Sequence, residues 1–460
     1  MRLTLVALLA APAFAQVPLP TSSPAAPIIE ARQRRAASLK EVLTIADARS
    51  PDLKSARAQA AQVVAQTRQA FSAVFPEITF NASYVHTSAE QQFDMSGLGQ
   101  LFVALQQPVP AGLDKPTTIV ARNSFYATAQ LTQTFFTPAM FALPAADHGR
   151  AAAELGANEA REQILLNIAR IYYGAQGLDG LVQAARDAES VQLKRERDAR
   201  NKLEVGTGTA VELLRAQAET AAGRNTLSML EAQRESLLVL LEALVGEAVR
   251  PLDVIDSVDV GAAAAESEKP WESTYVVKAN RQAISAQESL VTYRNVQWMP
   301  SLVGIAKGGY NSNKGFAETN FTGDLIVALS WTLYDRGARY VALHEDEAKL
   351  ADAQAKAEGS TAKARATWLS ALTNLKAAEA QLKQSEAQLE VASRAQREID
   401  NAVKGGLATA LELSDIDSKR FFAQSATAQA RSQLQLRKVE LAAAEGRLAQ
   451  AFGLQDKPLR

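Results

Sequence analysis

The chain has 460 residues, and its 49 basic and 50 acidic side chains nearly cancel. This balance gives no support for nucleic-acid binding, and the absence of cysteine excludes disulfides, thiol catalysis and thiolate metal sites. Aromatic residues make up only 6% of the chain, and the abundance of Ala, Leu, Gln, Glu, Lys and Arg is typical of long helices and coiled coils.

Residues 1–15 have the pattern of a cleaved export signal. Arg2 supplies a positive charge, residues 3–11 are apolar, and Ala13-Phe14-Ala15 is a small-x-small cleavage site. A buried N-terminal helix is the alternative interpretation. We expect no N-terminal lipid anchor, because its attachment would need a cysteine. No later run is apolar and long enough for a transmembrane helix, so an exported protein of this kind is either soluble or crosses a membrane as β-strands.

Two helices are predicted after a lead segment rich in Pro, Ser and Ala. Ser38 and Glu41 lie three residues apart and predict a capping box at the start of the first helix. Pro51 ends that helix and permits a new start. The second helix is expected over 53–75, since Pro76 disfavours helix in the residue before it.

The period then changes from that of a helix to that of a strand. Residues 78–84 alternate between apolar and polar, and so do residues 128–135. A long loop rich in Gly, Pro and Gln is expected between them, over about 87–121. These segments predict a β-hairpin over 77–136.

A long helical pattern follows over 139–204, before a turn and a second helix over 211–244. Gly174, Gly177 and Gly180 recur in it at three-residue spacing. This stripe indicates either close approach of a neighbouring helix or local looseness of the backbone.

The second half of the chain repeats this order of elements. The elements are expected over 273–296 (helix), 301–334 (hairpin, with the clearest alternation over 324–334), 337–403 (helix) and 410–452 (helix). Pro300 takes the place of Pro76, and the hairpin loop over 311–320 is much shorter than its counterpart.

The turn between the two long helices of each half has nearly the same sequence. Val-Gly-Thr-Gly-Thr-Ala-Val-Glu-Leu at 205–213 reappears as Gly-Gly-Leu-Ala-Thr-Ala-Leu-Glu-Leu at 405–413. A repeat of about half the chain indicates that one structural unit was duplicated. The predicted division is a signal peptide (1–15), a lead with a short equatorial helix (16–52), a first repeat (53–246), an equatorial linker (247–272), a second repeat (273–454) and a tail (455–460).

The four strands expected in the chain have the length of membrane-spanning β-strands, which is about ten residues. Four strands are too few to close a barrel, because the smallest membrane barrels have eight. An open sheet would expose unpaired edges to lipid at high cost, so several copies would have to share one barrel. A soluble sheet is the alternative.

At this point the sequence resembles the TolC-type outer-membrane efflux proteins of Gram-negative bacteria, over about 38–454. The resemblance rests on the helix beginning Ser38-Leu39-Lys40-Glu41-Val42, the prolines before each hairpin, the two glycine-turn segments, and the helix ends at 244–246 and 451–453. It implies a mainly α fold with β-strands: a homotrimer whose transmembrane β-barrel, with four strands from each chain, continues into a long periplasmic α-helical barrel.

The function implied by this resemblance is that of a passive outer-membrane exit duct in a tripartite efflux pump or type I secretion system. The implied partners are outer-membrane lipid, a periplasmic adaptor protein and an inner-membrane pump, and the implied cargo is drugs, other small molecules or secreted polypeptides. A periplasmic coiled-coil scaffold or adaptor-like protein without a pore is the alternative from another class.

The sequence suggests neither a catalytic residue nor a cofactor or metal site. The three histidines, His86, His148 and His344, are far apart in the chain. His344 and Glu347 lie one helical turn apart and in principle suit a metal, but a solvated charged face is the commoner explanation.

The candidate gate residues are acidic side chains just after the glycine turns. Glu412 and Asp415 lie on one helix face, and in a trimer they would form rings of carboxylates that favour cations and raise one another's pKa. The resemblance supports both residues as constriction residues, whereas complementing the helix dipole is the alternative. Glu212 is the weaker candidate, because Arg215 follows it and is expected to neutralise it, whereas the Glu412 and Asp415 pair is expected to lack such a partner.

Two further expectations concern the same region. Asp417 lies off the face of the two gate acids and is expected to be structural or solvated. The predicted adaptor-docking residues are those of the two turns: Gly206, Thr207, Gly208, Gly405, Gly406 and Leu407.

Overall fold

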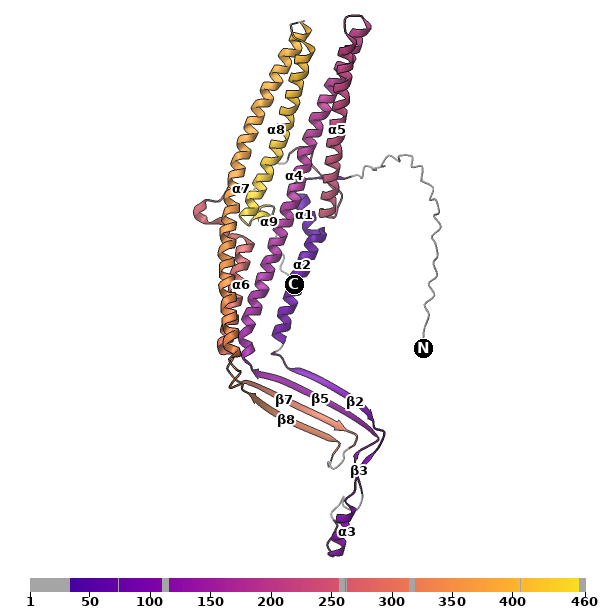
Figure 1. Ribbon diagram of the computed structural model, residues 1–460, viewed down its shortest axis with the longest axis vertical. Helices are drawn as coiled ribbons and strands as arrows, with labels where there is room; N and C mark the ends of the chain where they lie inside the picture. The colour runs from indigo at the N-terminus through magenta and orange to yellow at the C-terminus, as the bar shows by residue number, and fades with distance from the viewer. Residues whose placement is uncertain are drawn as a thin grey trace, which may run out of the picture.

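The computed structural model describes residues 34–72, 74–109, 116–255, 261, 263–313, 319–405 and 407–454. The expected signal peptide, the tail 455–460 and Gly406 lie outside these residues. The chain is elongated, with helical rods at one end and a β-sheet at the other (Figure 1).

Four long helices form two hairpins. The first hairpin consists of α4 (Leu143–Glu204) and α5 (Ala210–Val245), and the second of α7 (Ala338–Lys404) and α8 (Ala410–Ala444). With 67 residues, α7 spans about 100 Å at the helical rise of about 1.5 Å per residue. The two hairpins contact each other through α4 and α8.

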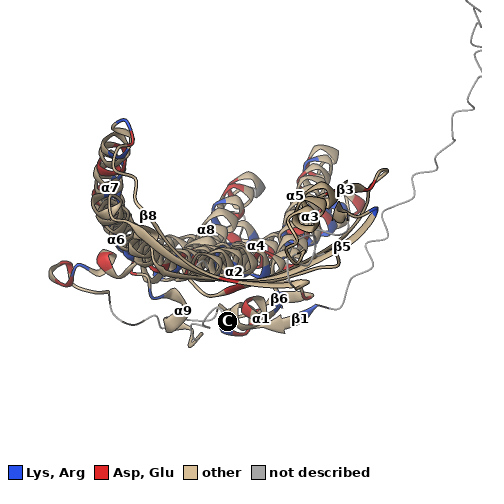
Figure 2. Ribbon diagram, turned by 90° about the horizontal axis from the view of Figure 1, so that it is seen from below, with Lys and Arg blue, Asp and Glu red and all other residues tan. Residues whose placement is uncertain are grey.

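Two shorter helices fill the half of the rod layer nearest the sheet. α2 (Pro51–Ser72) packs on α4, and α6 (Tyr275–Val296) packs on both α4 and α7. The neighbours are therefore α7, α8, α4 and α5 towards the tips, and α7, α6, α4 and α2 towards the sheet. Viewed along the rods, this layer is an arc with a concave side (Figure 2).

The helix ends follow local rules of capping and turn formation. α1 (Leu39–Arg49) begins with the predicted capping box of Ser38 and Glu41. The single helix expected over 410–452 is wrong: α8 ends at Ala444, and a separate α9 covers Leu448–Ala451. Gly446 lies between them with φ of 67°, a left-handed conformation that a continuous helix does not contain.

The main sheet has four antiparallel strands. β2 (Glu77–His86), β5 (Asn123–Phe136), β7 (Ser301–Asn311) and β8 (Phe321–Ser330) lie in the order β2-β5-β7-β8. β8 ends before Tyr334, the end expected from the alternation. Past Ser330 the chain leaves the sheet towards α7, and the Trp331 indole donates a hydrogen bond to the Trp298 carbonyl at 2.9 Å.

The long loop expected over 87–121 carries structure of its own. It contains β3 (Gln91–Phe93), α3 (Ser96–Ala104) and β4 (Thr117–Val120), with β3 and β4 paired antiparallel. This small unit lies beyond the end of the sheet that is far from the rods (Figure 1).

The largest apolar core lies at mid-height of the rods. Here β1 (Arg35–Ala37) pairs in parallel with β6 (Val249–Pro251), which brings the described parts of the lead and the linker together. The fully buried side chains of this core include Leu39, Leu43, Leu165, Ile168, Tyr172, Leu241, Val245 and Leu448. This core therefore joins α1, α4, α5 and α9 into one unit. In the described part of the chain, no helix combines the length and the apolar character needed to cross a membrane.

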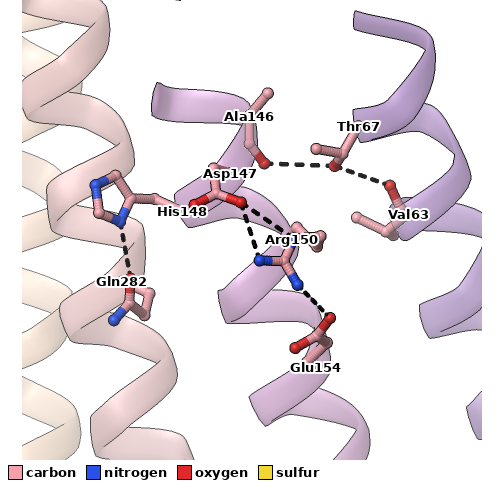
Figure 3. Close-up of polar contacts among 8 residues, drawn as sticks. All are labelled: Val63, Thr67, Ala146, Asp147, His148, Arg150, Glu154 and Gln282. Carbon is pink, nitrogen blue, oxygen red and sulfur yellow. Dashed lines mark hydrogen bonds and ion pairs between the residues drawn. The ribbon is translucent and has the colours of Figure 1, made fainter. Parts of the chain in front are cut away.

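Between the core and the sheet, side-chain hydrogen bonds join neighbouring helices (Figure 3). The Thr67 hydroxyl of α2 donates to the Ala146 carbonyl of α4 at 3.4 Å, and His148 Nδ1 of α4 lies 2.9 Å from Gln282 Oε1 of α6. On α4 itself, Arg150 bridges Asp147 and Glu154.

Candidate functional site

The register of the main sheet separates an apolar face from a mixed face, on which polar side chains lie beside Ile305 and Ile326. One cross-strand row, running from β2 to β8, consists of Ile78, Leu131, Ala306 and Leu325. The adjacent row consists of Thr79, Gln130, Lys307 and Asp324. Because successive strand residues point to opposite sides, these two rows belong to opposite faces.

The apolar face is uncovered. Ile78, Phe80, Leu325, Val327 and Leu329 are all exposed, and apolar surface of this extent needs an apolar environment or a partner. β2 and β8 are the edges of the sheet within the chain, so each presents backbone groups that another strand can pair with. The sheet is thus incomplete in a single copy.

The first tip turn owes its shape to two glycines. Gly206 has φ of 77°, which side-chain-bearing residues rarely adopt. A Cβ at Gly208 would lie 2.9 Å from Lys202 Cβ, so close backbone approach also requires glycine there. The Thr207 and Gly208 amides both donate to the Lys202 carbonyl at 2.9 Å and close the turn.

The second tip turn is closed differently. Gly405 has an ordinary right-handed helical φ of −83°, and the Leu407 amide donates to the Ala402 carbonyl at 2.8 Å. The Leu407 side chain is 88% exposed. Other exposed apolar side chains near the tips are Val205, Val211, Leu214 and Leu411, which were not among the predicted docking residues. The sequence repeat could have identified two of them, because Val211 and Leu411 occupy the same position in the two repeats.

Glu212 and Glu412 have the same local role in the structure. Each carboxylate accepts from the backbone amide of the N-cap threonine, Thr209 at 3.1 Å and Thr409 at 2.7 Å, and each completes a capping box. The Thr409 hydroxyl also lies 2.9 Å from the Glu412 carboxylate. Hydrogen bonds from Thr409 hold the pKa of Glu412 below its ordinary value, with the larger effect from the backbone amide and the smaller from the hydroxyl. The rise in pKa expected from a ring of like charges requires several copies and is not present within one copy.

The other candidate acids also have partners. Asp415 pairs with Lys419 at 2.6 Å, so the expectation that it lacks a neutralising partner is wrong. Glu212 caps Thr209 instead of showing an ion pair with Arg215, in the part of the chain that the structure describes. The acids of the two tips are therefore more alike than the sequence indicated, although the turns before them are closed differently.

Asp417 is structural, which is one of the two roles expected for it. Its carboxylate forms an ion pair with Arg195 of α4 and accepts from Gln396 Nε2 of α7 at 2.6 Å. Gln396 Oε1 in turn accepts from Arg420 of α8 at 2.8 Å. Asp417 thus links the two helical hairpins below their tips, at a cavity of about 370 Å³.

Nearer the core, the same seam between the hairpins is closed by small residues. A Cβ built at Gly180 of α4 would lie 2.6 Å from the Cβ of Ala428 of α8, and one at Gly177 would lie 3.3 Å from Ser432 Oγ. Gly174 instead faces Leu237 of α5, at 3.4 Å. The close-approach interpretation of the glycine stripe is therefore confirmed, and the neighbour at Gly177 and Gly180 is a helix of the second repeat.

The histidines have ordinary hydrogen-bond partners. His344 is exposed and lies 3.0 Å from Glu347, and His86 lies 2.7 Å from Asn123. Within the described ranges, no group of three or more His, Cys, Asp or Glu side chains is arranged to hold a metal ion.

Comparison with known proteins agrees with this arrangement of two repeats. Residues 42–247 and 275–447, which cover both repeats, match the family described as outer membrane efflux protein. The chain belongs to the outer membrane efflux protein family. The resemblance to TolC-type proteins stated from the sequence is thereby confirmed.

Solved structures of outer membrane proteins and channels share the fold. VceC, an outer membrane protein of Vibrio cholerae, is 21% identical with a TM-score of 0.71, over 89% of this chain and 96% of its own. The CmeC outer membrane channel of Campylobacter jejuni is 16% identical with a TM-score of 0.73, over 89% and 86%. The MtrE outer membrane channel of Neisseria gonorrhoeae, solved in its open state, is 14% identical with a TM-score of 0.71, over 89% and 88%. A comparison with curated protein sequences finds no match. These structural relatives are thus named as outer membrane proteins or channels, not as enzymes.

Proposed function

We propose that this efflux-family chain is the outer-membrane exit duct of a tripartite efflux pump or type I secretion system in a Gram-negative bacterium. The observation that carries the proposal is the open, two-faced sheet joined directly to rods of about 100 Å. The apolar face suits lipid, the charged side chains of Lys307 and Asp324 on the opposite face suit a water-filled lumen, and the rods suit a passage through the periplasm.

The proposed assembly is a homotrimer. Each copy would pair its β8 edge with the β2 edge of the next, so that three sheets of four strands close a twelve-stranded barrel. Closure removes the unpaired edges that would otherwise meet lipid. The concave side of the arc would face the common axis, and the long hairpins would line a helical tube around it.

The proposed partners meet the tips. The turns around Gly206 and Leu407, with the exposed apolar side chains of Val211 and Leu411 beside them, would dock a periplasmic adaptor that connects to an inner-membrane pump. Exposed apolar side chains that gather at a helix tip suit contact with a protein partner.

Cell fractionation and planar bilayers test this function directly. We expect the mature protein in the outer membrane as a trimer that resists detergent and that forms ion-conducting pores after reconstitution. A freely soluble periplasmic monomer would contradict the duct and support a coiled-coil scaffold.

The proposed gate is an acidic ring made of Glu412 and Asp415, and substitution by amides tests it. Glutamine can replace glutamate in a capping box, so Glu412→Gln combined with Asp415→Asn removes charge while keeping the helix start. We expect the reversal potential in a salt gradient to show weaker cation selectivity in this variant. Glu412→Gln alone is compared with Glu212→Gln, the weaker gate candidate at the same position of the first tip, so that each variant loses one carboxylate per chain. Equal effects of these two changes on the reversal potential would contradict a gate formed by the second tip alone.

The capping contacts of Glu412 predict how the gate responds to acid. Because the pKa of Glu412 is lowered, its carboxylate takes up a proton at a lower pH than an ordinary glutamate does. Thr409→Ala removes the hydroxyl contact but leaves the backbone amide, so the pKa should rise part of the way back, and cation selectivity should be lost at a higher pH. Reversal potentials measured over a pH series check this shift. Thr209→Ala is the control, and identical pH profiles for Thr409→Ala and the wild type would contradict the assignment.

A further inference from the structure

Helix α3 is apolar and exposed. The sequence from Met95 to Val109 has no charged residue. Leu98, Leu101 and Leu105 recur at i, i+3 and i+7, so they form one stripe along the helix and its end. All three side chains are more than half exposed, at 52%, 53% and 62%.

This stripe has no cover within the described part of the copy that carries it, and hydrogen bonds attach the β3–β4 ribbon, from which α3 projects, to the main sheet. β3 and β4 pair with each other, and the Thr87 amide donates to the Arg122 carbonyl at 2.8 Å where the ribbon leaves the main sheet. Asn313, two residues after the end of β7, donates from Nδ2 to the Ile119 carbonyl at 2.9 Å. The ribbon is thus attached to both hairpins of the sheet.

The position of α3 indicates what covers the stripe. α3 lies beyond the end of the sheet, past the strands that would cross the membrane (Figure 1). Seen along the rods, it lies on the concave side of the arc, the same side towards which the helix tips lean (Figure 2). In a closed ring of copies, the concave sides face one axis, so the α3 helices converge on it. A membrane-facing helix would lie on the convex side instead.

We propose that the α3 stripe of each copy packs against the α3 helices of the other copies, and that together they form an apolar constriction at the outer mouth of the duct. This inference rests on the proposed trimeric duct. It adds a second narrow point, at the opposite end from the acidic tips and of opposite chemistry. Apolar constrictions restrict the passage of ions by excluding water from the narrow point.

Disulfide trapping tests this contact cleanly, because the chain has no cysteine. Leu101→Cys places a single thiol on the stripe, and Gln100→Cys places one on another exposed face of the same helix as a matched control. Thiols of neighbouring copies join only where their Cα atoms come within about 7 Å. On oxidation of trimers in outer-membrane vesicles, we expect about tenfold more covalent dimer for Leu101→Cys than for Gln100→Cys, because converging helices give the thiols a high effective concentration.

Two outcomes would overturn the constriction. The first is equal trapping of the two variants in samples that run as intact trimers. The second is quenching of a bimane label on Leu101→Cys by brominated lipid, which would show that the stripe lies in the membrane. Native gels of the same samples distinguish this failure from a failure of the proposed function. If neither the wild type nor any variant forms trimers, the duct itself is contradicted. If trimers form but no disulfide is trapped, only the constriction is contradicted. Leu98→Cys repeats the test on the same stripe in case Leu101→Cys fails to assemble.

Discussion

Replacing Asp47 by alanine is expected to destabilise the folded chain more than any other single change proposed for it. Asp47 is 5% exposed, and its Oδ1 accepts from Arg161 Nε at 2.8 Å and from Arg57 at 2.7 Å. These contacts join α1 to α4 and α2 beside the mid-height core. Arg161 is also only 5% exposed, so removal of the carboxylate takes one ion-pair partner away from a buried cation. Breaking a buried ion pair in this way costs about 3–5 kcal/mol.

The midpoint of thermal unfolding, followed by circular dichroism in detergent, measures this loss. Asp52→Ala is the matched control, because Asp52 is exposed in the first turn of α2 and its contribution through the helix dipole is about 0.3–1 kcal/mol. The double variant Asp47→Ala with Arg161→Met should recover part of the loss, since it also removes the buried charge that Asp47 contacts. Equal midpoints for Asp47→Ala and Asp52→Ala would show that the mid-height core does not depend on this cluster.

Gly180→Ala is the second large effect that we expect. A single added methyl group would stand 2.6 Å from the Cβ of Ala428, a separation that forces α4 and α8 apart. Overpacking of this kind costs about 1–3 kcal/mol. Because α4 and α8 belong to different repeats, the change should loosen the seam between the two helical hairpins and lower the unfolding midpoint.

Gly156→Ala is the matched control on the same helix, because nothing lies within 4 Å of the Cβ position there. By helix propensity alone, alanine is favoured over glycine by about 1 kcal/mol, so this variant should be as stable as the wild type or more so. Gly180→Ala combined with Ala428→Gly restores the space and should recover most of the stability. If the unfolding midpoint of Gly180→Ala equals or exceeds that of Gly156→Ala, the seam accommodates the added methyl group without loss of stability.

Only those features of the candidate site that depend on residues close together in the chain could be predicted from the sequence. The glycine turns, the threonine caps and the acids after them are all set within a few residues, so the repeated segment places them at the helix tips. The capping box around Glu412 follows from Thr409 three residues earlier, although the sequence-based prediction for this acid was a gate and did not include the cap. The link between Asp417 and Arg195 was not predictable, because the two residues belong to different repeats and meet only when α8 packs on α4.

The same distinction applies to the whole chain. By itself, the sequence determined the duplicated order of elements, the lengths of the rods and the alternation of the strands, because helix period, strand period and capping depend on neighbours in the chain. The tertiary structure decided which elements meet: that β5 pairs with β7 across the two repeats, that Ala428 fills the space at Gly180, and that α3 lies on the concave side of the arc. These contacts join segments far apart in sequence, and their register depends on how whole helices and strands fit together, which no local pattern encodes.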